Sequence, residues 1–326
     1  MSKRVLLTGA NGFVAGSIIA QAGEAIELHA VSRGVPIFGR RSPNQTGASP
    51  HPVFGHFTDN ITARSHFRWH QLAPDNLAGW QRLFDSVHPD GVIHTAAIAD
   101  IDFCQANPGI CRQANVEFTR TLAKLCAAHD AKFVFCSTDT VFDGEHAPYR
   151  EDDSVGPVNL YAESKVEAEN IVAATRARNV IARLALVVGL PVLGAGNSFV
   201  EKLLASLRAG RTISVPPHEI RTPVDVITLG RALLELATGP FLGILHLAGN
   251  ERLNRLEINR RIAAKFGFSS DLVLPSSAVN TPGRVQRPRD VSLDNTRARS
   301  ELSTPMLGFD AALDLISRFS PISNQP

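Results

Sequence analysis

The sequence predicts an α/β protein built on a Rossmann-type doubly wound parallel sheet, with a smaller C-terminal substrate-binding lobe. Strand and helix patterns alternate through the first half of the chain, which is typical of βαβ units. The first strand also leads directly into a glycine-rich turn and a helix. The predicted strands are Arg4–Thr8, Glu27–Ser32, Phe67–Leu72, Gly91–Thr95, Lys132–Ser137 and Val180–Leu184, with helices between them such as Leu77–Val87 and Gln113–His129.

A change of pattern near residue 186 predicts two domains. Residues 1–185 are expected to form a dinucleotide-binding Rossmann domain. Residues 186–326 are expected to form mainly the second lobe, with some elements returning to the Rossmann sheet. The elements expected after residue 186 are helices at Ser198–Ala209, Ile227–Ala237, Leu256–Phe266 and Phe309–Phe319, and strands at Thr212–Val215 and Gly243–Leu247.

A Gly- and Pro-rich insertion at 34–66 interrupts the first domain. A connection of this length is unusual inside a βαβ unit. Because it follows the second strand, it should lie near the adenosine half of a bound dinucleotide. The insertion is either a mobile loop or a functional lid.

The glycine-rich turn predicts a dinucleotide site. Three glycines, Gly9, Gly12 and Gly16, follow the apolar run at 5–7 with the spacing GxxGxxxG. Glycine lets the backbone approach a pyrophosphate, and the following helix offers free N–H donors and the positive end of its dipole. A glycine-rich turn without a ligand is the alternative. The residues of this turn expected to contact the cofactor are Gly9, Asn11, Gly12, Phe13 and Val14.

Thr138, Tyr161 and Lys165 indicate the chemistry. Tyr161 and Lys165 are four residues apart, so on a helix they share one face. An ammonium beside a phenol favours the phenolate and lowers the pKa of the phenol. A tyrosine tuned in this way can exchange a proton with a carbonyl or an alcohol. A YxxxK pair alone is common, but downstream of a glycine-rich turn it is far more specific.

The composition argues against several classes of protein. Hydrophobic residues make up 44% of the 326 residues and charged residues 20%, as in an ordinary soluble globular protein. The net charge of +2 argues against nucleic-acid or membrane partners. No apolar run approaches the roughly 20 residues that span a bilayer. A strand begins almost at the N-terminus and leaves no room for a signal peptide. We therefore expect a cytoplasmic protein with a small-molecule substrate.

The four cysteines are interpreted as structural thiols in a reducing compartment. They form no CxxC pair and no histidine cluster accompanies them, so no metal site is expected. They are Cys104, Cys111, Cys126 and Cys136.

These features together resemble the extended short-chain dehydrogenase/reductase family, and within it the dTDP-4-dehydrorhamnose reductase branch. The match is strongest over 91–170, where GVIHTAAIADIDFCQANPGICRQANVEFTRTLA leads into FCSTDTVFDG, PYREDD and NLYAESKVEAE. The segment RPRDVSLDNTRAR also resembles this branch. The resemblance covers nearly the whole chain. It implies an NAD(P)-dependent oxidoreductase that reduces a ketone on a sugar-like substrate, with a nucleotide-linked sugar as one option and a homodimer as the family's frequent assembly.

The resemblance also assigns roles to residues. Tyr161 would be the general acid that protonates the substrate oxygen, Lys165 would tune Tyr161 and bond to the nicotinamide ribose, and Thr138 would bond to the reacting oxygen. Asn115 fits the structural asparagine that helps to position the lysine. Thr138 and Asn115 could instead be simple caps. The residues expected to line the cofactor after the third and fourth strands are Gln71, Leu72, Thr95, Ala96 and Ala97.

The end of the second strand favours NADP over NAD. An acidic residue there would bond to the ribose 2′-hydroxyl and select NAD. This chain has Ser32 and Arg33 instead, and a guanidinium suits a 2′-phosphate. A solvated Arg33 with relaxed cofactor specificity is the alternative, so NAD stays open.

Four residues are predicted to contact the substrate. In the family, an arginine at the position of Arg221 often faces a substrate diphosphate, and another substrate-side arginine often lies at the position of Arg287. Together they hint at a nucleotide-linked substrate. Asp139 and Thr140 follow the catalytic threonine. Rhamnose-pathway enzymes usually have tyrosine where this chain has Thr140, which removes an aromatic wall from the sugar site. The Asp-Glu pair of the dehydratases is also missing, which disfavours dehydration.

Two alternatives to a reductase stay open. A sugar epimerase would use the same threonine, tyrosine and lysine with a retained cofactor. A nucleotide-binding regulatory subunit is the other, because the β subunit of methionine adenosyltransferase resembles the same branch and shares its STD-VFDG and NLYxxxK pattern.

Overall fold

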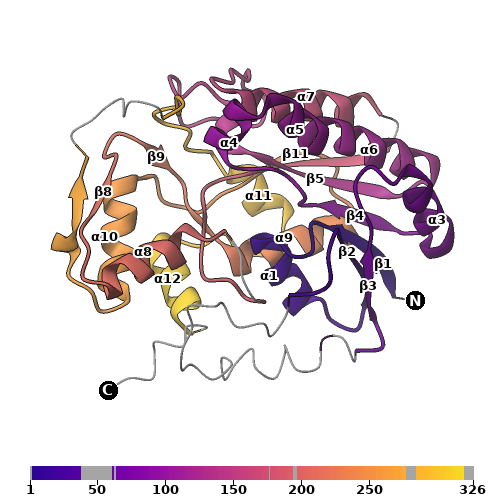
Figure 1. The fold of residues 1–326 in the computed structure, drawn as a ribbon, viewed down its shortest axis with the longest axis horizontal. Coiled ribbons are helices and arrows are strands. Elements are labelled where there is room, and N and C mark those ends of the chain that lie inside the picture. Colours follow the sequence, from indigo (N-terminus) through magenta and orange to yellow (C-terminus); the bar gives the residue numbers. More distant parts are fainter. Residues whose placement is uncertain are drawn as a thin grey trace.

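A seven-stranded parallel sheet forms the centre of the molecule (Figure 1). The structure is a computed structural model that describes residues 2–37, 61, 64–175, 177–193, 197–276 and 284–318. The strand order β3-β2-β1-β4-β5-β6-β11 reverses between β1 and β4, as in a doubly wound fold. The strands are β1 (Lys3–Thr8), β2 (Ile26–Ser32), β3 (Phe67–Gln71), β4 (Gly91–His94), β5 (Lys132–Thr138), β6 (Arg178–Leu184) and β11 (Gly243–Leu247).

The predicted fold class is confirmed, and each of the six predicted sheet strands of the first half is present. Side chains of β1 show why these strands are almost continuously apolar. Val5 and Leu7 pack on one face of the sheet, and Leu6 packs on the other. Because helices cover both faces, β4 and β5 are buried along their whole length, and the inner positions of β1 are buried too. The helices are α1 (Phe13–Gln21) and α9 (Val226–Thr238) on the first face, and α3 (Leu77–Val87), α6 (Phe118–Ala128) and α7 (Leu160–Ala174) on the second.

The strand predicted at Gly243–Leu247 joins the main sheet as its edge. It is β11, and it pairs in parallel with β6. Helix α9 likewise packs against α1. Several elements from the second half of the sequence therefore complete the Rossmann sheet and its covering layer. The division of the chain at residue 186 stays a prediction.

The remaining elements form a lobe with its own apolar core beside the sheet (Figure 1). Its helices are α8 (Phe199–Arg208), α10 (Arg255–Lys265) and α12 (Phe309–Arg318). Short strand pairs join it to the sheet domain: β7 (Val187–Val188) with β10 (Val224–Asp225), β9 (Ile220–Arg221) with β12 (Leu253–Asn254), and β8 (Ile213–Val215) with β13 (Val273–Pro275). Short helices lie at α4 (Ile101–Ala106), α5 (Pro108–Arg112) and α11 (Thr296–Glu301).

The helix predicted at Gln113–His129 is interrupted. A π-helical turn at Gln113–Glu117 follows α5, and α6 starts only at Phe118. Single π-helical turns inside helices occur frequently at functional sites. Most of the insertion at 34–66 lies outside the described residues. In the described parts of the chain, no helix has the length and apolar character to cross a membrane.

Candidate active site

A cleft of about 740 Å³ opens where the strand order reverses. Ligands of open α/β sheets bind at this place, outside the carboxyl ends of the strands. Nine residues that the sequence predicted for the cofactor line this cleft, namely Gly9, Asn11, Gly12, Ser32, Arg33, Leu72, Thr95, Ala96 and Ala97.

Gly9 forms the floor of the cleft. Its φ of +74° lies in the left-handed region, and an added Cβ would lie 2.8 Å from the backbone nitrogen of Ala96. Any side chain at Gly9 would therefore push apart the turns after β1 and β4. Helix α1 starts after Gly12 without a capping side chain, so its first N–H groups are open to an acceptor. This cradle of bare backbone fits a dinucleotide pyrophosphate.

Asn11 ties the glycine turn to the end of β2. Its Nδ2 donates to Ser32 Oγ at 3.1 Å and to the Val35 carbonyl at 3.0 Å. Its Oδ1 accepts from the backbone nitrogen of Ile37 at 3.3 Å. Arg33 is exposed on the cleft wall, and its guanidinium contacts no acceptor among the described residues. The wall that would meet a ribose 2′-substituent therefore carries one hydroxyl and one free cation.

The other predicted cofactor residues lie outside the lining of the cleft, namely Phe13, Val14, Gln71, Tyr161 and Lys165. Phe13 and Val14 open α1, and the exposed Gln71 donates to the backbone carbonyl of Arg33 at 3.2 Å. Sequence reasoning missed a set that does line it: Ala73, Pro74, Asp75, Ile98, Ile110 and Gln113. The first three follow β3 as Arg33 follows β2, so the rule that ligands bind beyond the carboxyl ends of parallel strands could have found them. Ile110 and Gln113 depend on the π-helical turn, for which the sequence gives no signal.

The three residues predicted to be catalytic come from two adjacent elements. Thr138 ends β5, and Tyr161 and Lys165 lie one turn apart on α7. Asn159 caps α7 by accepting from the Ala162 nitrogen at 3.0 Å, which fixes where the helix starts. All three are buried: 8% of Thr138, 9% of Tyr161 and 2% of Lys165 is exposed.

Burial determines the charge states of Tyr161 and Lys165. Burial raises the pKa of Tyr161, a hydrogen bond with Thr138 lowers it in part, and the charge of Asp139 raises it. The sequence-based expectation of a lowered phenol pKa is therefore wrong for this structure. Burial also lowers the pKa of Lys165 to about 8. Its Nζ donates to the Cys136 carbonyl at 2.6 Å. At neutral pH the phenol is thus protonated and the lysine is largely charged.

Asn115 lies in the π-helical turn and is almost fully buried. Its Oδ1 accepts from the Ile98 nitrogen at 2.8 Å, and its Nδ2 donates to the Ile98 carbonyl at 3.0 Å. The same Nδ2 lies 3.1 Å from Ser164 Oγ, next to Lys165 on α7. Asn115 thus fastens the turn after β4 and α7 to each other, and it acts on the lysine only through this scaffold.

The turn after Thr138 holds a buried carboxyl. Asp139 Oδ1 accepts from Thr138 Oγ1 at 3.2 Å, and Thr140 Oγ1 lies 3.1 Å from the same hydroxyl. Asp139 Oδ2 is buried without a hydrogen bond, and Arg221 Nε lies 3.9 Å away. Burial raises the pKa of Asp139 to about 6, although the charge of Arg221 opposes the change.

The two arginines predicted to face the substrate are bonded within the chain. Arg221 donates to the carbonyls of Ile220 at 2.6 Å, Arg289 at 3.2 Å and Pro288 at 3.3 Å. Arg287 forms a bidentate pair with Asp102 at 2.8 and 2.6 Å. This pair lowers the pKa of the Asp102 carboxyl to about 2. The donors of Arg221 and Arg287 are therefore largely occupied in this structure.

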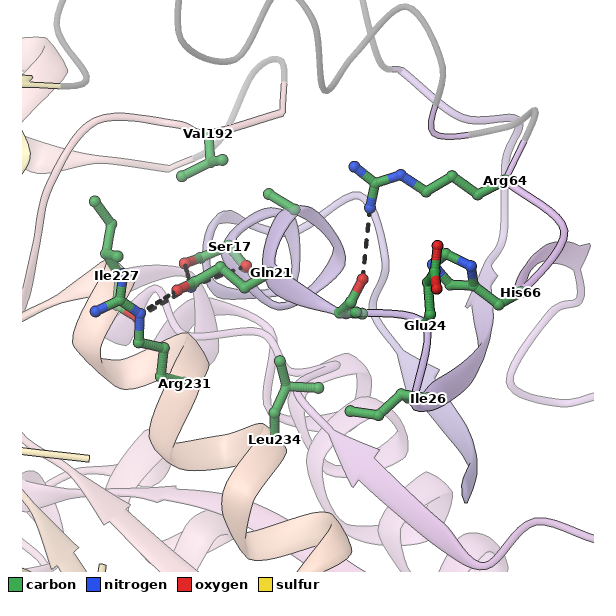
Figure 2. A pocket seen from close by; sticks show the side chains of 13 residues that line it. Ser17, Gln21, Glu24, Ile26, Arg64, His66, Val192, Ile227, Arg231 and Leu234 are labelled. Carbon is green, nitrogen blue, oxygen red and sulfur yellow. Dashed lines mark hydrogen bonds between the residues drawn. The ribbon is translucent and has the colours of Figure 1, made fainter. Parts of the chain in front are cut away.

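A second hollow, of about 790 Å³, lies against α1 and α9 (Figure 2). Gln21 lines this hollow. Its Nε2 donates to Ser17 Oγ at 2.8 Å, and its Oε1 accepts from Arg231 Nε at 2.8 Å. None of the predicted site residues lines it. All four cysteines are free and buried. In the parts of the chain that the structure describes, no group of three His, Cys, Asp or Glu could hold a metal ion.

The parallel sheet, the bare glycine cradle at its switch point, and the Thr–Tyr–Lys set beside it define an oxidoreductase of the extended short-chain dehydrogenase/reductase class. Within this class, the chain belongs to the RmlD family, whose model for the RmlD substrate binding domain matches residues 3–318.

Curated relatives and solved structures agree with this family. The chain is 30% identical over 233 residues to the dTDP-4-dehydrorhamnose reductase of Mycobacterium tuberculosis H37Rv, which covers 69% of this chain and 75% of the relative. It is 28% identical over 302 residues to the bovine (Bos taurus) methionine adenosyltransferase 2 subunit beta, with 91% and 81% covered. The crystal structure of the Bacillus anthracis dTDP-4-dehydrorhamnose reductase has the same fold, with a TM-score of 0.79, 21% identity, and 97% and 99% covered.

Proposed function

We propose that this protein reduces a ketone on a sugar-like, nucleotide-linked substrate, with NADPH as the reductant and Tyr161 as the general acid. The observation that carries the proposal is a buried, protonated phenol at the start of α7, near Thr138 and one helical turn from Lys165. Tyr161 packs in one apolar cluster with Ile98, which lines the dinucleotide cleft. A reductase needs an acid that holds its proton until the substrate oxygen gains charge. A phenol whose pKa is raised meets this requirement.

The preference for NADP rests on the wall after β2. Ser32 and the exposed Arg33 stand where an acidic residue would select NAD, and the Arg33 guanidinium is free to bind a 2′-phosphate. The related B. anthracis reductase is described in complex with NADP, which supports the same choice. NAD is the alternative cofactor.

The chain's own residues would move one proton. The bound nicotinamide would supply the hydride. Tyr161 would give its phenolic proton to the substrate oxygen as charge develops there, and Thr138 would hold that oxygen through its hydroxyl. The Lys165 ammonium, buried and close to the ring of Phe135 at 4.1 Å, would stabilise the resulting phenolate.

The substrate class is tested by following NADPH absorbance with a panel of nucleotide-linked and free keto sugars. Oxidation with a nucleotide-linked member, and little with the corresponding free sugar, is the expected result. If NADPH is oxidised with neither kind of sugar, the proposed function is wrong. A protein that purifies with tightly held nucleotide and isomerises a sugar without net NADPH oxidation would be an epimerase.

A regulatory subunit is the second candidate, and the similarity to the bovine methionine adenosyltransferase 2 subunit beta favours it. This role would require a stable partner. Isolation of the tagged protein from its native cells, followed by size-exclusion chromatography with light scattering, separates the two roles. A stoichiometric partner would support the regulatory role, and its absence together with NADPH turnover would support the reductase.

A further inference from the structure

Arg255 is a half-buried cation without an ion-pair or hydrogen-bond partner among the described residues. It is the first residue of α10, and its backbone nitrogen donates to the Glu219 carbonyl at 2.8 Å. Its guanidinium lies over the ring of Phe199, 4.6 Å from the ring centre. Among the described residues, no carboxylate oxygen lies within 4 Å of this guanidinium, and none of its N–H groups makes a hydrogen bond. Burial lowers the pKa of Arg255 to about 10.

A half-buried guanidinium without a polar partner is stabilised when an acceptor binds it. Buried charges in proteins are normally paired and hydrogen-bonded. Arg255 has five N–H donors in a planar fork, and Phe199 covers only one face of that plane. The edge of the fork is therefore available to an acceptor that is not part of the described chain.

The surroundings of Arg255 are positive overall. Arg221 and Arg284 act on it as like charges, and Glu219 and Asp139 as opposite charges. Glu219 is already shared, with Arg284 at 2.8 Å and Arg221 at 3.9 Å from its two oxygens. Three guanidinium groups against two carboxylates leave a net positive charge around Arg255. Such a charge cluster attracts an anion.

This charge cluster adjoins the residues predicted to be catalytic. Arg221, which acts electrostatically on Arg255, lies 3.9 Å from the carboxyl of Asp139, and Asp139 follows Thr138 directly. The donors of Arg221 and Arg287 are already taken by carbonyls and by Asp102. Among these arginines, Arg255 is thus the one with a fork that is free to bind.

We propose that Arg255 binds an oxyanion of the substrate, a phosphate or a carboxylate, in a bidentate manner beside the catalytic threonine. Planar, bidentate contact with phosphate or carboxylate is the recognition for which arginine is best suited. The inference deepens the proposed function, since it assigns the anion contact of that same substrate to Arg255. Two sources share this chemistry: the diphosphate of a nucleotide sugar, and the carboxylate of an acidic sugar.

Calorimetry of the full-length protein saturated with NADPH tests this assignment. The probes are UDP and dTDP for the diphosphate source, and glucuronate for the carboxylate source. The variants are Arg255→Gln, which removes the charge, and Arg255→Lys, which keeps the charge but removes the fork. Arg208→Gln is the matched control, because Arg208 is an exposed arginine of the same lobe on the helix that carries Phe199.

We expect one class of probe to bind the wild type and the Arg208→Gln variant alike. Arg255→Gln should weaken the affinity for that probe by about tenfold to a hundredfold, because charge-assisted hydrogen bonds are lost. The affinity of Arg255→Lys should lie between those of Arg255→Gln and the wild type. The NADPH affinity should be unchanged in every variant, which reports that the protein is folded. If Arg255→Gln cannot be obtained folded, the comparison between wild type and Arg255→Lys decides.

Equal probe affinity in wild type and the Arg255 variants would overturn the assignment, and so would failure of every probe to bind the wild type. Because binding is measured without turnover, the outcome is independent of the reductase assay. If the protein binds a diphosphate through Arg255 but never oxidises NADPH, the role of Arg255 is supported and the proposed reductase function is wrong.

Discussion

Replacing Asp139 with asparagine should stabilise the folded protein, and by more as the pH rises. Asp139 is 5% exposed, and its Oδ2 makes no hydrogen bond. Burial raises the pKa of this carboxyl from 3.8 to about 6 in the folded protein. Between these two values the folded state binds more protons than the unfolded state, so stability falls as the pH rises through this window.

The size of the effect follows from the difference in pKa. A carboxyl whose pKa rises from 3.8 to about 6 costs about 3 kcal/mol of folding free energy once it is fully ionised. Asparagine carries no charge at any pH and does not incur this cost. The stability of Asp139→Asn relative to wild type should therefore increase by about 2.5 kcal/mol between pH 4 and pH 8, because a small part of the cost is already present at pH 4.

Equilibrium urea unfolding at pH 4, 5, 6, 7 and 8 measures this difference. Any constant cost of placing an amide at residue 139 cancels, because the same variant is compared at each pH. Asp152→Asn is the control, since it removes a carboxyl from the exposed surface of the chain. A stability difference for Asp139→Asn that stays flat across this range would refute the reasoning. A difference that shrinks as the pH rises would also refute it.

Two further substitutions test the scaffold of the site. Gly9→Ala should weaken NADPH binding by about tenfold or more, because its Cβ would lie 2.8 Å from the Ala96 nitrogen at a left-handed φ. Fluorescence titration with NADPH measures this affinity. An unchanged affinity would contradict the role of the glycine turn in binding the dinucleotide. Glu169→Gln should destabilise the protein by about 3–5 kcal/mol, because it leaves the buried Arg183 guanidinium, now 2.8 Å from Glu169, without its counter-charge. Glu163→Gln, an exposed change on the same helix, should cost less than about 1 kcal/mol in urea unfolding, and equal losses for both variants would rule out this account of the ion pair.

The sheet could be predicted from the sequence because its strands are buried on both faces. Runs such as residues 5–7 and 133–136 are apolar without alternation, and glycine or polar residues bound them. The glycine turn and the YxxxK pair are local patterns, so their places after β1 and on α7 could also be predicted. Local patterns of this kind carry their structure with them.

The parts that could not be predicted depend on contacts between distant segments. The π-helical turn around Asn115 gives no sequence signal, because it forms where that side chain bonds to the Ile98 backbone. The bonding of Arg221 to carbonyls near residue 288 depends on how the lobe folds back. The state of Tyr161 is a matter of burial, which outweighs the nearby lysine that the sequence suggests.

Arg255 gives the clearest example of this limit. In the sequence it is an ordinary arginine at the start of a helix, a position with no motif around it. Only the fold brings it over Phe199 and near Arg221 and Arg284, and only there does its lack of a partner become visible.

The central claim is tested most directly by the rate of NADPH oxidation in wild type and in Tyr161→Phe, with the best keto sugar of the panel. The account predicts that the variant binds NADPH as wild type does but loses turnover by about a hundredfold or more, since general acid catalysis contributes about 10²–10⁴-fold. Turnover within a few-fold of wild type, with NADPH binding intact, would contradict the role of Tyr161 as the general acid.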